Sequence, residues 1–427
     1  MRSDSIFGEK VFGEKVLLTV RAKSVSACVC VVGVGFVGES LVREFSKVHK
    51  TIGYDISTAR INHLRPAFSD CPNAVLSSDE TVLAHGTHYL IAVPTLLGAD
   101  RSVDTTHLNN AIQMVLSYAR PGCTIVIESS VSVGTTRKLL GAHTDMYCGM
   151  SPERIDPGRI SPAPADIAKV VSGLTPDALI QIQKLYTRAF TNIVAVSSPE
   201  VAEMTKLFEN CYRMVNIAYV NEINDACLEH GIDPREMMAA AATKPYGFSS
   251  FTPGLGVGGH CIPVNPFYLF ENNHDLPVLR QATKRTLARP KRMASVFHEH
   301  ATKQMRKPRF TRSKPRILVA GVAFKPGQSS IEQSPAAQFL GHLRRQGCSK
   351  LSFYDPLVKQ RSVTFAEKLK TPQWTAKHIL DNYDAVAVCM SQEKVDMSVL
   401  DSLPEVCNTM IIHNLLHNRL RIGCSCQ

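Results

Sequence analysis

Cys28-Val-Cys-Val-Val-Gly33-Val-Gly35-Phe-Val-Gly38-Glu-Ser-Leu-Val42 is the stretch that decides the fold. A short apolar run leads into glycines spaced GxGxxG, and a helix-forming segment follows. In this setting Gly33 permits a tight turn, Gly35 lets the backbone approach a pyrophosphate, and Gly38 lets helix and strand pack closely. The free N–H groups of the helix start are suited to phosphates. The stretch therefore predicts a dinucleotide-binding turn.

An acidic residue ends the next apolar run. Ile52-Gly-Tyr-Asp55 places a carboxylate where such turns bind the ribose hydroxyls of a dinucleotide. The carboxylate favours NAD, because it would repel the extra phosphate of NADP. Arg60 stands close enough in the sequence to reach the adenosine side. We therefore predict NAD as the cofactor.

Short apolar runs recur between amphipathic stretches in two parts of the chain, which is typical of parallel sheets with crossover helices. They cover 28–32, 51–54, 89–93, 124–127 and 193–196, and then 317–322, 351–354, 385–390 and 410–412. Between the two parts, Ser198-Pro-Glu starts a helix that runs without a breaker to His230. A basic, proline-containing linker is expected at 303–314.

The predicted fold class is α/β, with two Rossmann-like doubly wound parallel-sheet domains joined by a central long-helix segment. We expect an NAD-binding domain over residues 24–198, a helical dimerisation and catalytic segment over 199–303, and a C-terminal α/β domain over 315–427. We assign no function to the extension formed by residues 1–23.

Composition narrows the class of protein. A hydrophobic content of 44% and a charged content of 20% fit a soluble globular enzyme. The net charge of +11 suits anionic small molecules better than nucleic acid, because the basic residues are dispersed and lack an interleaved aromatic pattern. The 13 cysteines form no CxxC pair, which disfavours a disulfide scaffold and a zinc site. No apolar stretch reaches the length of a membrane span. We expect a cytoplasmic protein without metal, membrane or nucleic-acid partner.

The glycine-dense segment Pro253-Gly-Leu-Gly-Val-Gly-Gly-His-Cys261-Ile-Pro-Val-Asn265-Pro266 predicts a fixed, irregular loop that lies close to a partner. Backbone N–H groups around Cys261 would stabilise a thiolate and later an oxyanion. His260 either activates this thiol or is a loop residue with a satisfied ring, and we favour the second. A buried structural role is the usual fate of cysteine, and we expect it for Cys123, Cys148, Cys227 and Cys389.

Lys206 and Asn210 stand one helical turn apart, so they share one face of the long helix. Both side chains donate hydrogen bonds, and in a cleft they would suit an oxygen that gains negative charge. From composition alone, a solvated helix face is the better interpretation. The case for a site depends on a resemblance that covers most of the chain.

From about residue 25 to residue 388 the sequence resembles the UDP-glucose/GDP-mannose 6-dehydrogenase family. Besides the turn, the Lys206 helix and the Cys261 loop, the matching segments are Ala92-Val-Pro-Thr95, Glu128-Ser-Ser-Val131, Gly134-Thr-Thr136, Ser151-Pro-Glu-Arg-Ile-Asp-Pro-Gly158, Ala323-Phe-Lys325-Pro326 and Tyr354-Asp-Pro356. The Ser151–Gly158 segment and Lys244-Pro-Tyr-Gly-Phe248 are most similar to the branch acting on UDP-N-acetylhexosamines, above all UDP-N-acetylglucosamine 6-dehydrogenases.

The resemblance implies roles for individual residues. Cys261 would attack the C6 aldehyde, Lys206 and Asn210 would stabilise the reacting oxygen, and Glu153 would serve as acid and base, with Asn265 beside them. The residues that would line the NAD site are Gly33, Gly35, Phe36, Val37, Gly38, Asp55, Arg60, Pro94, Thr95 and Ser130. The residues that would hold a UDP-sugar are Glu153, Lys206, Asn210, Gly254, Gly256, Gly258, Phe324 and Lys325. A homodimer through the long helix is also implied.

Several positions depart from the family pattern. Asn265 stands for an aspartate, Ser130 for a threonine, and Thr286-Leu287 for an Asn-Asp pair. Glu332 and Leu415 stand for arginines. A lost arginine clamp removes hydrogen bonds worth about 1.5–3 kcal/mol each. The alternative is therefore a catalytically weakened homologue with a regulatory or scaffold role. A hydroxyacid dehydrogenase would leave the Cys261 loop unexplained.

Overall fold

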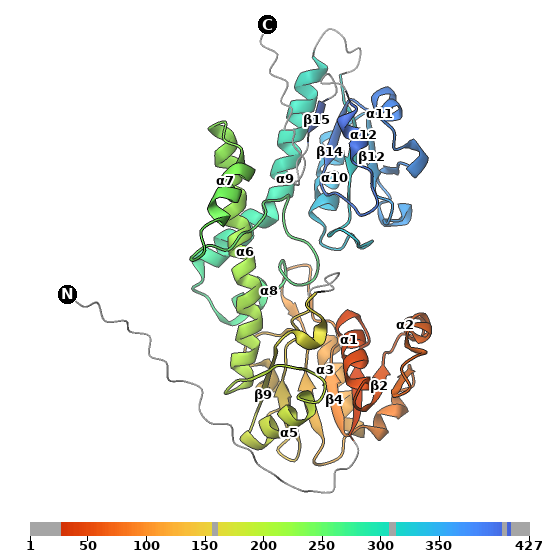
Figure 1. The fold of residues 1–427 in the computed structure, drawn as a ribbon, viewed down its shortest axis with the longest axis vertical. Helices are drawn as coiled ribbons and strands as arrows, with labels where there is room; N and C mark the ends of the chain where they lie inside the picture. Colours follow the sequence, from red (N-terminus) through yellow and green to blue (C-terminus); the bar gives the residue numbers. More distant parts are fainter. Residues whose placement is uncertain (1–26, 156–160, 307–312, 404–407, 411–427) are drawn as a thin grey trace, which may run out of the picture.

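The computed structural model describes residues 27–155, 161–306, 313–403 and 408–410. Two α/β lobes lie at opposite ends of the molecule, and two long helices run between them (Figure 1). These helices are α6 (Pro199–Glu229) and α9 (Pro277–Met305). The predicted fold class, with two parallel-sheet lobes joined by long helices, is confirmed.

The N-terminal lobe contains a mixed sheet that is parallel except between β8 and β9. Its strand order is β10-β9-β8-β7-β4-β1-β2-β3. The bounds are β1 Cys28–Val32, β2 Lys50–Tyr54, β3 Ala74–Ser77, β4 His88–Ile91, β7 Thr124–Ile127, β8 Tyr147–Met150, β9 Lys169–Gly173 and β10 Ile193–Ala195. A small hairpin joins β5 (Leu96–Leu97) to β6 (Val103–Asp104). The sequence pattern did not predict β3, β8 or β9.

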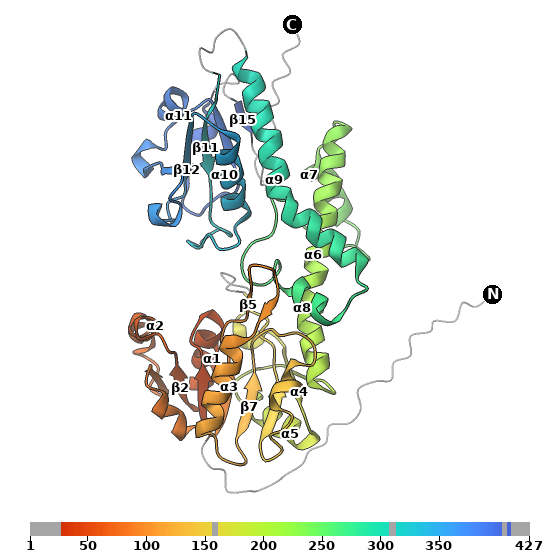
Figure 2. The same ribbon diagram turned by 180° about the vertical axis from the view of Figure 1, so that it is seen from behind.

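Helices cover both faces of this sheet. Alternate residues of β1 enter different cores: Cys28, Cys30 and Val32 pack with α3 (Thr106–Tyr118), whereas Val29 and Val31 pack with α1 (Phe36–Ser46) and α5 (Pro176–Tyr186). In Figure 2, α3 lies on the side of this sheet that faces the viewer. The lobe is completed by α2 (Thr58–Leu64) and α4 (Thr135–Leu140). Burial on both faces explains why β1 reads as a continuous apolar run.

The C-terminal lobe repeats this plan on a smaller scale. Its parallel sheet has the order β13-β12-β11-β14-β15. The bounds are β11 Arg316–Ala320, β12 Lys350–Tyr354, β13 Glu367–Lys368, β14 Ala385–Val388 and β15 Asn408–Met410, with α10 Pro335–Gln346, α11 Ala376–Asn382 and α12 Ser398–Asp401. Ile317 and Val319 face α9 and α10, while Leu318 and Ala320 face α11. The C-terminal half of α9 therefore belongs to this core.

The first turns of the two lobes have the same geometry. Gly33 donates its N–H to the Tyr54 carbonyl at 2.8 Å, and Gly321 donates to the Tyr354 carbonyl at 2.8 Å. Both glycines have a positive φ, +88° and +76°, which favours glycine. Each lobe thus begins with a strand, a glycine turn and a second strand that ends in Tyr-Asp.

The aspartates that follow these tyrosines differ in their surroundings. Asp55 accepts the Val34 N–H at 2.9 Å and stays partly exposed. Asp355 accepts the Val322 N–H at 3.0 Å but is completely buried. Its oxygens also accept the N–H of Ala323 and the amide of Gln392. Only Asp55 is accessible to a ligand.

The central segment contains α6, α7 (Pro234–Ala242), α8 (Asn265–Asn272) and α9. Ser198 caps α6 through the N–H of Val201, as predicted. Pro290 lies inside α9. The linker expected at 303–314 starts later than predicted, because α9 continues to Met305. Residues 1–23 and Leu415 lie outside the described residues.

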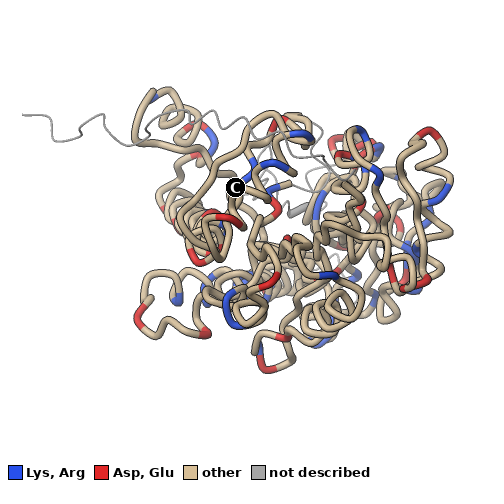
Figure 3. The backbone as a smooth tube through the Cα atoms, turned by 90° about the horizontal axis from the view of Figure 1, so that it is seen from below, with Lys and Arg blue, Asp and Glu red and all other residues tan. Residues whose placement is uncertain are grey.

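Charged residues are spread over the molecule. Figure 3 shows Lys and Arg mixed with Asp and Glu along the tube. Among the described residues, no helix is long and apolar enough to cross a bilayer. Within the same part of the chain, no group of three or more His, Cys, Asp or Glu side chains is placed to hold a metal ion.

Candidate active site

Cys261 lies on the turn that leads into α8. Its carbonyl accepts the N–H groups of Val264 at 3.2 Å and Asn265 at 2.9 Å, so these donors bind the backbone and not the sulfur. Cys261 is exposed, whereas every other cysteine in the described ranges is buried or half-buried. Cys123, Cys148, Cys227 and Cys389 are buried as predicted. The thiol with access to a ligand is therefore the one predicted to react.

Lys206 brings a buried positive charge to this thiol. The residue is 8% exposed, and no hydrogen bond or ion pair to its ammonium is found among the described residues. Burial lowers the pKa of Lys206, while the neighbouring charges of Cys261 and Glu153 act in the opposite direction. An unpaired buried ammonium beside a thiol is suited to stabilise a thiolate or a developing oxyanion.

Asn210 and Asn265 form a direct pair. The Asn210 amide donates to the side-chain oxygen of Asn265, and both residues are buried. Asn265 thus keeps the hydrogen-bond acceptor that the family aspartate would supply, but without its charge. The pair joins α6 to the first residue of α8, next to Cys261.

Glu153 belongs to the N-terminal lobe, and its neighbours keep its side chain ionised. It follows β8, accepts the N–H groups of Arg154 and Ile155 at 2.6 and 2.8 Å, and accepts Lys169 at 2.9 Å. Burial opposes ionisation, but the Lys169 charge and these hydrogen bonds lower the pKa of Glu153. The structure therefore gathers Cys261, Lys206, Asn210, Asn265 and Glu153 at one place.

Close packing explains why Gly258 and Gly259 in the Cys261 loop are glycines. A Cβ on Gly258 would lie 3.0 Å from both the Phe324 and Pro335 side chains, and one on Gly259 would lie 2.9 Å from the Phe324 ring. The loop therefore packs directly on the C-terminal lobe. Lys325 follows Phe324 and is half-buried.

Gly254 is tied to the long helices. Its N–H donates to the Asn221 side chain at 2.7 Å, and its carbonyl accepts Arg289 at 2.7 Å. Arg289 in turn pairs with Asp225 at 2.7 Å. Protein neighbours therefore already engage this loop at Gly254, one of the glycines predicted to hold a UDP-sugar.

Thr286 faces α6 within the same chain. It is 2% exposed, and it lines a cavity of about 60 Å³ together with Asn221. The Thr286 hydroxyl and the Asn221 amide nitrogen have no hydrogen-bond partner in the described part of the chain. The departure at Thr286 thus leaves two polar groups unsatisfied at the α6–α9 contact.

His260 and Glu332 connect the two sides of the site. The His260 ring lies 3.3 Å from the Glu332 carboxylate, and both side chains are more than half exposed. His260 therefore has a partner other than the thiol, which agrees with the interpretation favoured from the sequence. Glu332, which stands for a family arginine, lies beside the Cys261 loop.

The GxGxxG turn has the geometry that a pyrophosphate requires. A Cβ on Gly35 would meet no atom within 4 Å, so the backbone is open to a ligand there. A Cβ on Gly38 would lie 1.8 Å from the Gly33 carbonyl oxygen, so only glycine fits. The glycine roles predicted from the sequence match these surroundings.

Other predicted NAD residues lie at the same edge of the sheet. Thr95 donates its hydroxyl to the Ser130 carbonyl at 2.8 Å, and Pro94 precedes it on the segment after β4. Arg60 donates to the Val34 carbonyl at 2.8 Å and pairs with Glu39 at 2.9 Å. Arg60 thus supports the turn directly. Phe36 and Val37 start α1, at the edge where α/β sheets bind ligands.

We expect a preference for NAD over NADP of about a hundredfold or more in kcat/KM, because the extra phosphate would meet the Asp55 carboxylate. Measurement of kcat/KM with both cofactors checks this. Asp55→Asn should narrow the ratio, whereas Asp79→Asn, an exposed change in the same lobe, should not. A wild-type preference for NADP would rule out the Asp55 assignment.

Lys169 was missed in the sequence, and Glu128 was noted only as part of a matching segment without a role. Lys169 starts β9 and contacts Glu128 at 2.6 Å as well as Glu153. Both side chains are almost completely buried. A lysine at the head of the apolar run Lys169-Val-Val-Ser-Gly173 was the available signal, because lysine is almost never fully buried without a partner.

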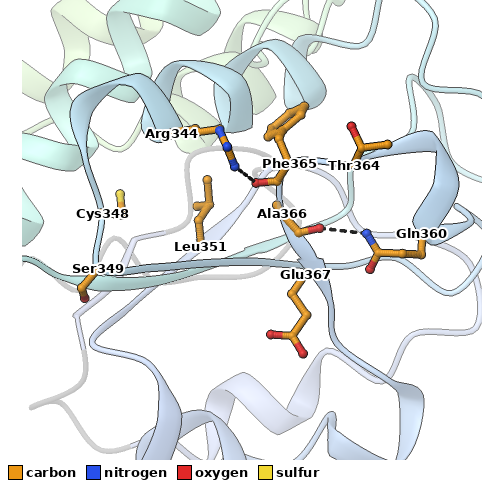
Figure 4. Close-up of a pocket in the computed structure, with 9 residues that line it drawn as sticks. All are labelled: Arg344, Cys348, Ser349, Leu351, Gln360, Thr364, Phe365, Ala366 and Glu367. Atoms are coloured by element: carbon orange, nitrogen blue, oxygen red, sulfur yellow. Dashed lines mark hydrogen bonds between the residues drawn. The ribbon is translucent and has the colours of Figure 1, made fainter.

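A separate hollow of about 720 Å³ lies on the C-terminal lobe. Figure 4 shows Arg344 bound to the Phe365 carbonyl and Gln360 bound to Ala366 at its wall. None of the predicted site residues lines it. It is therefore distinct from the Cys261 site.

The fold and the site define a dehydrogenase with a dinucleotide turn and an exposed cysteine. Three family models cover the chain: the NAD binding domain of the UDP-glucose/GDP-mannose dehydrogenase family matches residues 27–190, its central domain 200–287 and its UDP binding domain 318–415. The chain therefore belongs to this family, and it is an NAD-dependent sugar-nucleotide dehydrogenase.

Individual relatives agree with this assignment. A UDP-N-acetyl-D-mannosamine dehydrogenase of Pyrococcus horikoshii is 30% identical over 357 residues, covering 78% of this chain and 84% of the relative. A UDP-N-acetyl-D-glucosamine 6-dehydrogenase of Pseudomonas aeruginosa is 29% identical, covering 86% and 90%. The solved structure of a UDP-D-ManNAc dehydrogenase from Pyrococcus horikoshii superposes with a TM-score of 0.80 at 25% identity, covering 92% and 96%.

Proposed function

We propose that this enzyme oxidises the C6 alcohol of a UDP-sugar, a UDP-N-acetylhexosamine or UDP-glucose, to the uronate. The observation that carries the proposal is the buried Lys206 charge beside the exposed Cys261, with no hydrogen-bond or ion-pair partner for Lys206 among the described residues. This pair lies where the NAD-binding lobe, the long helices and the UDP-binding lobe meet. The names of the relatives support the choice of N-acetylhexosamines.

The proposed reaction has two oxidations and one hydrolysis. Two NAD molecules, bound in turn, would each take up one hydride. Lys206 and Asn210 would hold the C6 oxygen as the alcohol becomes an aldehyde, and Glu153, acting as the base through water, would take up the hydroxyl proton. Cys261 then adds to the aldehyde carbon, because an aldehyde has no good hydride-donating form until a nucleophile has added. The thiohemiacetal is oxidised to a thioester, and water assisted by Glu153 releases the uronate and the thiol.

The roles of the other residues follow from their positions. The 24–198, 199–303 and 315–427 parts are assigned to NAD binding, to dimerisation and catalysis, and to UDP-sugar binding. Gly254, Gly256 and Gly258 would hold the sugar through the loop backbone, with Phe324 and Lys325 on the opposite lobe. Asn265 would supply an acceptor without a proton-accepting carboxylate.

NADH formation over a panel of UDP-sugars and GDP-mannose tests this function. The panel includes UDP-glucose, UDP-N-acetylglucosamine, UDP-N-acetylmannosamine and UDP-N-acetylgalactosamine. The expected result is two NADH for each uronate with at least one UDP-sugar. Turnover restricted to GDP-mannose would overturn the UDP assignment.

A weakened homologue is the second candidate. Glu332 pairs with His260 instead of offering a cation, and Thr286 leaves a small unfilled cavity against α6. These two observations favour reduced ligand binding. Binding of NAD or UDP-sugar in calorimetry, without NADH formation from any sugar in the panel, would support this second function.

A homodimer forms part of the proposal. One side of α6 carries an exposed apolar row at helical spacing, here called the α6 stripe: Val201, Met204, Phe208, Tyr212 and Tyr219. Phe208 and Tyr219 are 65% and 64% exposed. A contiguous apolar row of this kind marks an interaction surface. A second copy related by two-fold symmetry would cover it with the same stripe.

Phe208→Glu combined with Tyr219→Glu should weaken association by about a hundredfold or more, because two aromatic anchors would become charges at the interface. Light scattering at micromolar concentration should then show a dimer for the wild type and a monomer for the variant. Ile56→Glu, at a residue 83% exposed on the N-terminal lobe, is the matched control and should stay dimeric. A monomeric wild type contradicts the assignment of the stripe.

A further inference from the structure

Three neighbouring strands place three charged groups together inside the N-terminal lobe. Glu128 directly follows β7, Glu153 follows β8, and Lys169 begins β9. The Lys169 ammonium lies 2.6 Å from Glu128 and 2.9 Å from Glu153. Their side chains are 3% exposed for Lys169, 0% for Glu128 and 9% for Glu153. Tyr186, also buried, donates its hydroxyl to Glu128.

The fold itself has no need of these charges. Taking three ionisable groups out of water is costly, and well-packed apolar residues of similar volume often serve stability as well or better. The surrounding strands are apolar on both faces, so apolar side chains would fit this layer. A fully paired buried network of this kind therefore calls for an explanation in function.

The hydrogen bonds leave Glu153 in one orientation. A carboxylate offers about four acceptor positions. Arg154 and Ile155 donate backbone N–H groups to one oxygen of Glu153, and Lys169 donates to the other. These three donors leave about one acceptor position without a donor among the described residues, and the charge of Glu153 acts on Lys206. Glu153 can thus accept a hydrogen bond from a water molecule without rotating.

The second carboxylate completes the arrangement. Burial raises the pKa of Glu128 to about 7, although the Lys169 charge opposes the rise. Burial works against a charge on Lys169 as well, but the two carboxylates raise its pKa, so it stays an ammonium. The titratable groups facing this cluster are Glu128, Glu153, Lys169 and Tyr186, with Lys206 beyond Glu153.

We propose that Lys169 is a positioning residue for the hydrolysis step: it fixes Glu153 as an oriented, ionised carboxylate, and Glu128 holds the ammonium in place. The inference deepens the proposed function and rests on it. In the step, water adds to the thioester carbonyl carbon and the carbon–sulfur bond breaks. The proton of the water passes through Glu153 to the Cys261 sulfur, so Glu153 ends ionised. Lys169 touches neither the substrate nor the sulfur.

The test separates oxidation from hydrolysis in Lys169→Met. Rapid mixing with NAD and the active UDP-sugar should still give a burst of two NADH per active site. Steady-state turnover should fall by about a hundredfold, the size of a general-base contribution. Intact-protein mass spectrometry should show the uronyl thioester on Cys261. Lys169 lowers the pKa of Glu153 in the wild type. Removal of Lys169 should therefore raise the pKa of Glu153 and move the acidic limb of the pH–rate profile to higher pH.

Two further variants guard against a purely structural effect. Lys169→Arg keeps the charge and should restore most of the turnover and the acidic limb. Lys169→Met with Glu128→Gln removes one charge of each sign, so it should fold like the wild type while still accumulating thioester. If burst and steady state slow equally, or if no thioester accumulates in the double variant, the positioning role is refuted. A wild type that makes no NADH from any UDP-sugar would instead refute the proposed function.

Discussion

Cys261→Ser is expected to abolish uronate release while leaving the first oxidation partly active. An ordinary thiol ionises near pH 8.5, whereas an alkyl hydroxyl stays protonated at neutral pH, so serine lacks the nucleophilic form. The neighbouring Lys206 charge can stabilise a thiolate but cannot remove a hydroxyl proton while it is itself protonated. The variant should therefore stop after one NADH per sugar, with an aldehyde as product.

The measurement combines NADH stoichiometry with product analysis. Wild type should give two NADH per uronate, and Cys261→Ser should give one NADH per aldehyde, which a hydrazine reagent captures. Cys71→Ser, at a half-buried cysteine away from the site, is the matched control and should behave as wild type. Full four-electron turnover by Cys261→Ser would refute covalent catalysis.

Lys206→Met should slow both oxidations by about a hundred- to a thousandfold, the usual cost of losing one donor to a developing oxyanion. The side chain is buried and unpaired within the described residues, so methionine fills the space without leaving a stranded partner. Folding should survive, and the loss should appear in the single-turnover rate of NADH formation and not only in KM.

A second measurement on Lys206→Met follows the reactivity of the Cys261 thiol. At a fixed neutral pH, alkylation of Cys261 by iodoacetamide should be slower in Lys206→Met, because a positive charge beside the sulfur has been removed. Lys206→Arg should retain part of both effects. Lys184→Met, at an exposed lysine on α5, should change neither. An unchanged alkylation rate in Lys206→Met would separate Lys206 from the thiol and contradict its assigned position.

The sequence predicted the parts of the fold that depend on local pattern. β1 reads as an apolar run because both its faces are buried, and Gly33 and Gly38 are required by a positive φ and by a close carbonyl contact. The long helix from Ser198 follows from its cap and the absence of breakers. β3, β8 and β9 were missed because none of them contains more than three consecutive apolar residues, whereas β1 contains five.

The candidate site was predicted through motifs, and contacts between distant segments were not. Cys261, Lys206, Asn210, Asn265 and Glu153 were named from motifs, but Lys169 carried no motif, and its contact with Glu153 depends on strands that were missed. The His260–Glu332 contact joins two lobes, so no local pattern signals it. The packing of Gly258 against Phe324 is equally non-local.

Helix α6 carries the Lys206–Asn210 pair on its buried side and the α6 stripe on its exposed side. If the protein associates through this stripe, α6 connects sugar-nucleotide binding to self-association. Any coupling between these two binding events is reciprocal. If sugar-nucleotide binding tightens self-association by some factor, self-association tightens sugar-nucleotide binding by the same factor. Mass action then makes the apparent substrate affinity depend on enzyme concentration when that concentration is near the dissociation constant of the dimer. Assays at nanomolar and at micromolar enzyme would in that case sample different molecular species.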